Sequence, residues 1–257
     1  GGTDIAYDLV KKAINNGKSV ITANKALIAE HGDELFTLSR QKNVYLGFEA
    51  AVAGAIPIIH TLTHNMQNEN ILSISGIING TCNYILDQMT SENKSFSDAL
   101  ANAQKLGYAE SDPTFDIGGF DAAHKISILA MLAYSMNSPY QNVFIEGIES
   151  IESMDIDYAD ELGYKIKHIG LVKAVASTIE CRVHPVLIHK SNIFSNVDGV
   201  MNAIRIVGDK FGTSMLYGHG AGGEATASAV VSNIIDFSNY INQSHNKEET
   251  HTRTKKN

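Results

Sequence analysis

Apolar positions recur with a helical period at the start of the chain and then give way to β-branched runs. Residues 4–16 place apolar side chains on one face and stop at Gly17, which is typical of an amphipathic helix ended by glycine. Residues 18–22 follow, and their last three positions are β-branched, which favours a strand. The pattern then predicts helices over 26–30 and 33–42 and a strand over 44–49. Helices alternating with strands in this way are typical of a parallel α/β sheet.

The middle of the chain is richer in long apolar runs. Residues 70–78 read as a buried strand, and either Asn79 or Thr81 is placed to cap the helix that follows. A second helix is expected from about 97 to 106, ending at Gly107. From Phe120 the chain is so apolar that we expect a helix buried on most sides.

The last third of the chain is dominated by strand patterns. We expect antiparallel strands of a mixed sheet over 143–148, 165–175 and 179–188, around a helix at 157–162, with further strands over 199–217. The glycine-rich run 218–223 opens a helix that reaches about Tyr240. Beyond it, residues 241–257 are polar without apolar periodicity, so this tail is expected to be disordered.

Composition narrows the class of protein. A formal charge of −8 and a pI near 5.6 argue against a nucleic-acid-binding surface. The two cysteines, Cys82 and Cys181, have neither metal-ligand spacing nor a disulfide framework, which favours a reducing, cytoplasmic setting. No apolar run reaches the roughly 18 residues of a membrane span, and no signal peptide is recognisable. The chain begins on Gly-Gly-Thr without Met, so we expect a fragment of a longer protein.

Residues 107–125 concentrate the candidate chemistry. A loop broken by Pro113 carries Glu110 and two further carboxylates and runs into the apolar helix, where Asp121 and Lys125 are four residues apart. Such a pair is either an ordinary solvated surface pair or, at the buried end of a helix, a proton-transfer site. Facing carboxylates of the loop, the pair is suited to binding a small zwitterion.

Three other stretches carry weaker signals. Lys25 follows a strand at the edge where open α/β sheets bind ligands, although a solvated loop lysine fits the position equally. Residues 49–57 are mostly small and apolar, which suits either tight strand-to-helix packing or a cation held by Glu49 and backbone carbonyls. The turn at 218–223 feeds a helix N-terminus and is therefore a candidate anion site.

Taken together, these stretches resemble homoserine dehydrogenase. The most specific piece is the run Tyr-Ala-Glu-x-Asp-Pro-x-x-Asp-x-x-Gly-x-Asp-x-Ala-x-Lys at residues 108–125. The matching pieces occur in the order of the family and span most of residues 1–240: 22–27, 48–57, 76–81, 107–125, 182–185 and 218–231.

The resemblance implies an α/β fold made of a partial Rossmann-type nucleotide-binding domain and an α+β substrate and dimerisation domain with a mixed sheet. It implies four segments: 1–48 in the nucleotide-binding domain, 49–217 in the substrate-binding, catalytic and dimerisation domain, 218–240 as a returning helix, and 241–257 as the tail. The family's first βαβ unit, with its main glycine fingerprint, does not occur before Gly1.

The resemblance also implies a reaction and a set of roles. The reaction is the NAD(P)-dependent interconversion of L-homoserine and L-aspartate 4-semialdehyde, in threonine and methionine biosynthesis, by a homodimer. Lys125 is implied as the acid/base, with Lys25 as its partner near nicotinamide and substrate. The remaining implied roles are Glu110 and Asp121 in substrate binding, Gly107 and Gly222 (with Lys25) in binding NADP or NAD, and Glu49, Val52, Gly54 and Ile56 around a monovalent cation such as sodium.

Two alternatives remain open at this point. One is a non-catalytic fragment that serves as a dimerisation module, and the other is a dehydrogenase for a different amino acid. The carboxylates and lysine of the central run fit a homoserine site and argue against the second alternative.

Overall fold

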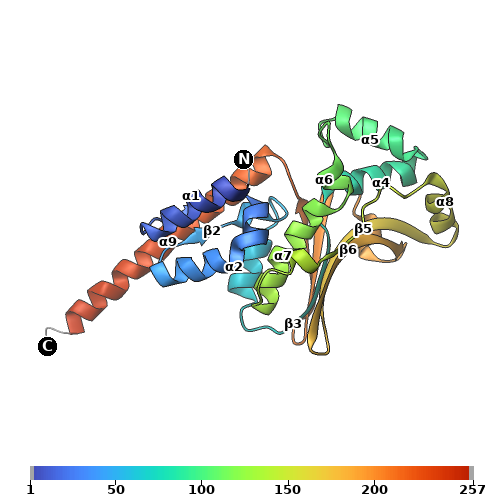
Figure 1. Ribbon diagram of the computed structural model, residues 1–257. Helices are drawn as coiled ribbons and strands as arrows, with labels where there is room; N and C mark the ends of the chain where they lie inside the picture. Colours follow the sequence, from blue (N-terminus) through green and yellow to red (C-terminus); the bar gives the residue numbers. More distant parts are fainter. Residues whose placement is uncertain (1–2, 255–257) are drawn as a thin grey trace.

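The protein is built around two separate sheets. The computed structural model describes the backbone of residues 3–254 and the side chains of residues 3–241. A small parallel sheet pairs β1 (Val20–Ile21) with β2 (Leu46–Gly47). A larger, mixed sheet has the strand order β4-β6-β5-β3-β7-β8, and the two sheets lie side by side with helix α7 (Phe120–Tyr134) between them (Figure 1). The mixed α/β fold expected from the sequence is confirmed.

Two helices pack on the small sheet and on each other, α1 (Thr3–Asn15) and α2 (Lys25–Lys42). Asn24 caps α2, because its side chain accepts a hydrogen bond from the Leu27 N–H at 3.1 Å. The predicted break between helices 26–30 and 33–42 is wrong, since α2 continues through Gly32. A β-carbon at Gly32 would lie 3.0 Å from the Met131 side chain, so glycine here allows α2 to approach α7 closely.

The larger sheet is mostly antiparallel. Strands β5 and β7 flank β3 in antiparallel register, and β6 and β8 continue the antiparallel pairing on either side. The strand bounds are β3 Ile71–Ile77, β4 Phe144–Ile145, β5 Tyr164–Val175, β6 Thr178–His189, β7 Met201–Gly208 and β8 Gly212–His219. The strand expected over 143–148 is shorter and pairs parallel to β6, so its predicted antiparallel direction is wrong.

Alternate residues of the larger sheet belong to different apolar clusters. Ile74 and Ile206 belong to the main core together with Ile126 and Leu129 of α7, which lies against β3, β5 and β6. Residues of the other set, Ile77, Ile169 and Ala203, form a smaller cluster with Phe194 of η4 and Val197 of the loop that follows it. One side of the sheet therefore carries the helix that holds the central motif.

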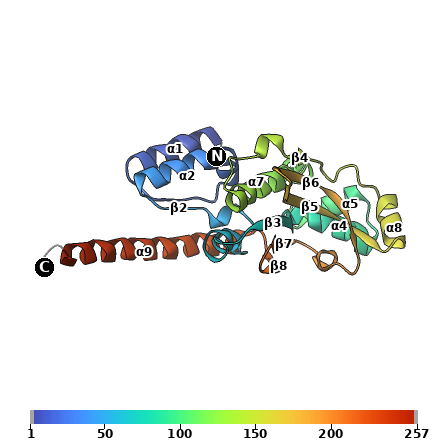
Figure 2. The same cartoon turned by 90° about the horizontal axis from the view of Figure 1, so that it is seen from below.

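The remaining helices are grouped around the end of the larger sheet (Figure 2). Helix α4 leaves the end of β3 and contacts β5 and β7, while α5 and α8 lie outside it. The bounds of these helices are α4 Gly80–Glu92, α5 Phe96–Lys105, α6 Thr114–Ile117 and α8 Ser153–Glu161. The short helical segments elsewhere in the chain are η1 Glu49–Ala51, α3 Ile58–His60, η2 Thr61–Asn65, η3 Tyr140–Asn142 and η4 Ile193–Asn196.

Helix α9 (Gly223–Thr254) begins beside the small sheet and extends well beyond the rest of the molecule (Figures 1 and 2). It is anchored by Asn233, which accepts a hydrogen bond from the Glu49 N–H at 2.8 Å and donates one to the Tyr45 hydroxyl. The prediction that residues 241–257 are disordered is wrong for residues 241–254, because α9 continues through them. Residues 255–257 lie outside the described part. A helix already formed can extend into a segment containing Lys, Glu and Arg without a new nucleation step.

None of the helices described in residues 3–254 is long and apolar enough to cross a membrane.

Candidate active site

Asp121 lies between two lysines at the start of α7. The Lys25 Nζ is 2.6 Å from Asp121 Oδ1, and the Lys125 Nζ is 2.7 Å from Asp121 Oδ2. Lys125 also donates a hydrogen bond to the carbonyl of Ile78 at 2.7 Å. The Asp121 side chain is 3% exposed, that of Lys125 is 10% exposed and that of Lys25 is 36% exposed. We call these three residues the lysine–aspartate cluster.

Local structure explains why these three side chains meet. Lys25 is the first residue of α2, directly after β1, and so lies at the carboxyl end of that strand. Gly119, with φ of 87°, lets the chain turn into α7, whose first two turns present Asp121 and Lys125 on one face. Burial of both side chains excludes a solvated surface pair at 121 and 125, and the contact of Lys25 with Asp121 excludes a free loop lysine.

The positive charges of Lys25 and Lys125 keep the Asp121 carboxyl group ionised. Burial acts to raise the pKa of Asp121, but the ammonium groups of Lys125 and Lys25 outweigh it and hold that pKa well below its usual range. The carboxylate therefore stays charged and fixes the position of both ammonium groups.

Sequence reasoning missed two residues of this site, Asn79 and Asp116. The Asn79 amide donates to Asp116 Oδ1 at 2.8 Å and to Asp121 Oδ2 at 2.9 Å. Its oxygen accepts the N–H of Cys82 at 2.8 Å, which makes Asn79 the cap of α4. Burial raises the pKa of Asp116, and the charge of Asp121 acts in the same direction. Asp116 lies within the central motif and Asn79 was a candidate cap, so both were visible but without an assigned role.

His124 packs beside the cluster. Its ring lies 4.2 Å from that of Tyr140 and 5.4 Å from that of Phe115, and its Nε2 is 3.5 Å from Glu30 Oε1 of α2. Burial lowers the pKa of His124 to about 4, and the positive charge of Lys25 acts in the same direction while Asp121 opposes it. The histidine is therefore neutral at pH 7, and its ring packs between the aromatic rings of Phe115 and Tyr140 and the Glu30 side chain of α2.

Glu110 and Gly107 lie on the exposed loop after α5. The Thr81 hydroxyl donates to the Tyr108 carbonyl at 2.7 Å, and the Gln104 amide donates to the Glu110 carbonyl at 3.1 Å. The first bond tethers the loop to the first turn of α4, next to Asn79, and the second tethers it to the end of α5. Within the described part of the chain the Glu110 carboxylate has no partner, and Gly107 (φ 75°) has open space around it. The structure therefore does not bring Glu110 into contact with the cluster.

The segment from Glu49 to Ile56 forms a buried turn. Both Glu49 carboxylate oxygens are occupied, accepting the N–H groups of Ile59 at 2.9 Å and His60 at 2.8 Å, and burial raises the pKa of this carboxyl. Val52 and Gly54 are buried, and in the described part of the chain their carbonyl oxygens accept no hydrogen bond. The same part contains no group of three or more acidic, histidine or cysteine side chains suited to a metal. A cation here would thus depend on main-chain oxygens.

The turn at 49–56 touches the glycine-rich loop before α9. The Ala55 N–H donates to the His219 carbonyl at 3.1 Å, and a β-carbon at Gly54 would lie 2.8 Å from the Gly220 backbone. Gly222 (φ 115°) is exposed with open space around it, directly before the first turn of α9. The loop therefore presents a free helix N-terminus of the kind that binds phosphate groups.

The arrangement can move a proton. Lys125 is an ammonium group held by a carboxylate and a carbonyl, and Lys25, which is more exposed, is bound to the same carboxylate. A substrate hydroxyl placed against either ammonium group would meet a proton donor or, after proton loss, an acceptor.

Comparison with known proteins identifies the family. The family model described as homoserine dehydrogenase matches residues 57–235, and the model described as homoserine dehydrogenase, NAD binding domain, matches residues 1–49. A homoserine dehydrogenase from Pseudomonas aeruginosa is 50% identical over 236 residues, which cover 92% of this chain and 54% of the relative. The chain thus spans about half the length of the curated relatives it matches.

Solved structures agree. A homoserine dehydrogenase from Thiobacillus denitrificans superimposes with a TM-score of 0.90 at 48% identity, covering 92% of this chain and 55% of that one. A hyperthermophilic archaeal homoserine dehydrogenase in complex with NADPH matches with a TM-score of 0.79 at 32% identity, covering 91% of this chain and 68% of that one. The chain belongs to the homoserine dehydrogenase family.

Proposed function

We propose that the protein containing this chain interconverts L-homoserine and L-aspartate 4-semialdehyde with NAD or NADP. The observation that carries the proposal is the buried Asp121 carboxylate shared by Lys25 and Lys125, in a chain of the homoserine dehydrogenase family. A bound nicotinamide would supply the hydride chemistry at the carbon that bears the hydroxyl group. The chain's own residues must then bind the substrate, orient it and remove the hydroxyl proton.

Lys125 is the proposed acid/base. Its side-chain nitrogen is fixed at the buried end of the cluster, so the atom that would take up the hydroxyl proton, once it is a neutral amine, has a defined position. Lys25 is the proposed partner at the more exposed end, where it would lie near substrate and nicotinamide and stabilise negative charge on the reacting oxygen.

Glu110 and Asp121 are the proposed binding residues for the substrate. The Glu110 carboxylate is exposed and unpartnered among the described residues, so it is available for the substrate ammonium. Asp121 is the second proposed binding carboxylate, and it also holds both lysines.

The cofactor is proposed to bind at exposed glycines, and the cation at main-chain carbonyl oxygens. The open surroundings of Gly107 and Gly222 leave room for a close backbone approach, and the N-terminus of α9 suits a phosphate group. With Lys25 these residues would hold NAD or NADP. The turn formed by Glu49, Val52, Gly54 and Ile56 would hold a monovalent cation such as sodium through main-chain oxygens, which hard cations prefer.

We further propose a homodimer in the cytoplasm, with residues 1–48 and 218–240 in the nucleotide-binding domain and 49–217 in the substrate and dimerisation domain. The smaller apolar cluster of the large sheet supports the dimer, because it is lined by partly exposed Val186, Ile188, Met201 and Met215. A chain that only dimerises is the second candidate, favoured by this same apolar face.

The test is oxidation of L-homoserine with NAD or NADP by the full-length product of the gene. Lys125→Ala is expected to lower kcat by about 100- to 10,000-fold, because a positioned acid/base contributes that much. Glu110→Gln is expected to raise the KM for homoserine with a smaller change in kcat.

Lys173→Ala is the matched control, since Lys173 forms a partly exposed ion pair with Glu180 on the sheet. Near-normal turnover in Lys125→Ala would reject the role of Lys125. A folded full-length product with no activity on homoserine would favour the dimerisation module.

A further inference from the structure

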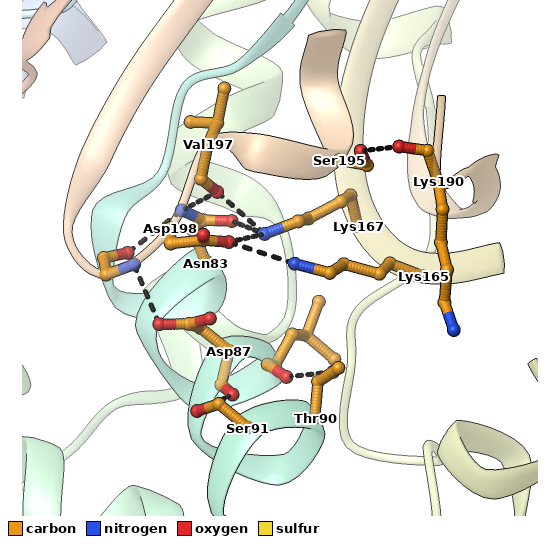
Figure 3. Close-up of polar contacts among 12 residues, drawn as sticks. Asn83, Asp87, Thr90, Ser91, Lys165, Lys167, Lys190, Ser195, Val197 and Asp198 are labelled. Atoms are coloured by element: carbon orange, nitrogen blue, oxygen red, sulfur yellow. Dashed lines mark hydrogen bonds and ion pairs between the residues drawn. The ribbon is translucent and has the colours of Figure 1, made fainter. Parts of the chain in front are cut away.

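A second lysine is buried outside the candidate active site. Lys167 of β5 is 2% exposed, and its ammonium group donates to the Val197 carbonyl at 2.6 Å and to Asn83 Oδ1 at 3.2 Å (Figure 3). It also lies 3.3 Å from Asp198 Oδ1, but that carboxylate is 49% exposed. The ammonium group is thus held largely by neutral oxygens.

Such a group is costly to bury. Burial lowers the pKa of Lys167, although the charges of Asp198 and Asp87 act in the opposite direction. Apolar side chains of similar volume often replace buried ionic groups without loss of stability. The polar contacts of Lys167 therefore call for a role in geometry rather than in stability.

The contacts of Lys167 dock one helix against one loop. Asn83 of α4 donates to the carbonyls of Val197 and Gly199, both at 2.9 Å. One turn further on, Asp87 accepts the Gly199 N–H at 2.9 Å. Since the Val197 carbonyl accepts from both Lys167 and Asn83, the lysine joins β5, α4 and the loop 197–199 at one point, as Figure 3 shows.

The N-terminus of the same helix lies at the lysine–aspartate cluster. Asn83 and Asp87 are four residues apart and share one side of α4, and Asn79 is the cap at the N-terminus of the same helix. Asn79 binds both Asp116 and Asp121, while Asn83 binds Lys167. An α-helix is a rigid rod in which a slip of one residue means about 1.5 Å and a rotation of about 100°. The docking of Asn83 and Asp87 thus sets where the Asn79 amide lies.

We propose that Lys167 is a positioning residue for the reaction, acting through α4 on the orientation of the Asp121 carboxylate. It touches neither substrate nor cofactor; it fixes the axial position of α4, and Asn79 passes that position to the carboxylate shared by Lys25 and Lys125. The proposal rests on the proposed function for its catalytic consequence. Its structural part, the coupling of Lys167 to Asn79, stands independently.

The experiment compares Lys167→Met with Lys165→Met in the full-length product. Lys165 is a matched control because it also reaches Asp198 Oδ1, at 3.5 Å, but within the described part of the chain it forms no hydrogen bond with α4. Lys167→Met is expected to lower kcat about 10-fold or more, with the KM for homoserine changed less than about threefold. Lys165→Met is expected to leave both constants unchanged.

Two further readouts separate positioning from general damage. Hydrogen exchange at the Cys82 amide, which is bonded to the Asn79 side chain, is expected to be faster in Lys167→Met and unchanged in Lys165→Met. Asn79→Leu combined with Lys167→Met is expected to lose little more kcat than Asn79→Leu alone, because both act through one path.

Each outcome decides the proposal. Unchanged kcat and unchanged Cys82 exchange in Lys167→Met would overturn it, as would additive losses in the double variant. If Lys167→Met does not fold, Lys167→Gln, which keeps a donor for the Val197 carbonyl, is expected to show a smaller shift in the same direction. Wild-type protein inactive on homoserine would reject the proposed function, and Cys82 exchange would then decide the coupling alone.

Discussion

Among the described side chains, two lysines are buried, and they lie in opposite kinds of surroundings. Lys125 is bound to a carboxylate that is 3% exposed and shared with the more exposed Lys25. Lys167 is bound to an amide oxygen and a carbonyl, and its nearest carboxylate is half exposed. Both are enclosed, but the cluster of Lys125 has one end open to solvent at Lys25.

This difference means that the lysine–aspartate cluster can exchange protons, whereas Lys167 can only hold neighbouring segments in position. A proton can leave or reach the lysine–aspartate cluster because Lys25 connects it to the surface. The ammonium group of Lys167 is enclosed by protein atoms, so its contacts serve geometry. Burial of a lysine is therefore not by itself a sign of catalysis. Its role depends on which group it is bound to and on whether a proton can pass between that group and solvent.

The largest expected difference between the two sites is in their carboxylates. Asp121→Asn removes the charge that balances Lys25 and Lys125, so the free energy of unfolding at pH 7 is expected to fall by about 3–5 kcal/mol. The midpoint and slope of urea unfolding measure this loss. Asp112→Asn, on the exposed loop before α6, is the control. A loss below about 1 kcal/mol in Asp121→Asn would mean that the ion pairs are dispensable.

Acid is expected to act on both sites through neighbouring histidines. His124 precedes Lys125 and His168 follows Lys167, both are buried, and burial lowers the pKa of each to about 4. Between pH 6.5 and 4 the unfolded chain binds protons that the folded chain excludes, so stability is full above pH 6.5 and falls as pH drops towards 4. We expect a loss of roughly 1–3 kcal/mol per histidine, measured by urea unfolding across this range.

The histidine variants sharpen that test. His168→Gln and His124→Gln are each expected to flatten the dependence between pH 4 and 6.5, while exposed His189→Gln leaves it unchanged. Retention of the full acid sensitivity in the double variant His124→Gln, His168→Gln would assign it to carboxylates instead.

Local chemistry explains what could be predicted from the sequence. The i,i+4 spacing of Asp121 and Lys125 predicts a shared helix face, and the structure confirms it. The sequence offers Asn79 or Thr81 as the cap of the helix after residues 70–78, and the structure shows that Asn79 is the cap. The contact of Lys25 with Asp121 joins positions 96 residues apart in sequence (121 − 25), and position relative to the strand end left the solvated alternative open.

Tertiary packing explains what could not be predicted. The gap predicted between the helices 26–30 and 33–42 contains Gly32, but α2 continues through it, and the missing side chain lets α2 lie against Met131. Lys167 occupies an alternating strand position with no local signal that its charge would be buried against α4. The role of Asn79 as a donor to Asp116 and Asp121 depends on how α6 and α7 meet α4, which no local pattern encodes.

The smallest expected effect is at the exposed carboxylate of the second site. Asp198→Asn is expected to change the free energy of unfolding by about 1 kcal/mol or less, because the Asp198 side chain is half exposed. Lys167 would keep its bonds to Val197 and Asn83 in this variant, so the docking of α4 should survive. Urea unfolding beside Asp121→Asn measures the contrast. Equal losses in the two variants would mean that Asp198 is the essential counter-ion of Lys167 and that the two buried lysines are held in the same way.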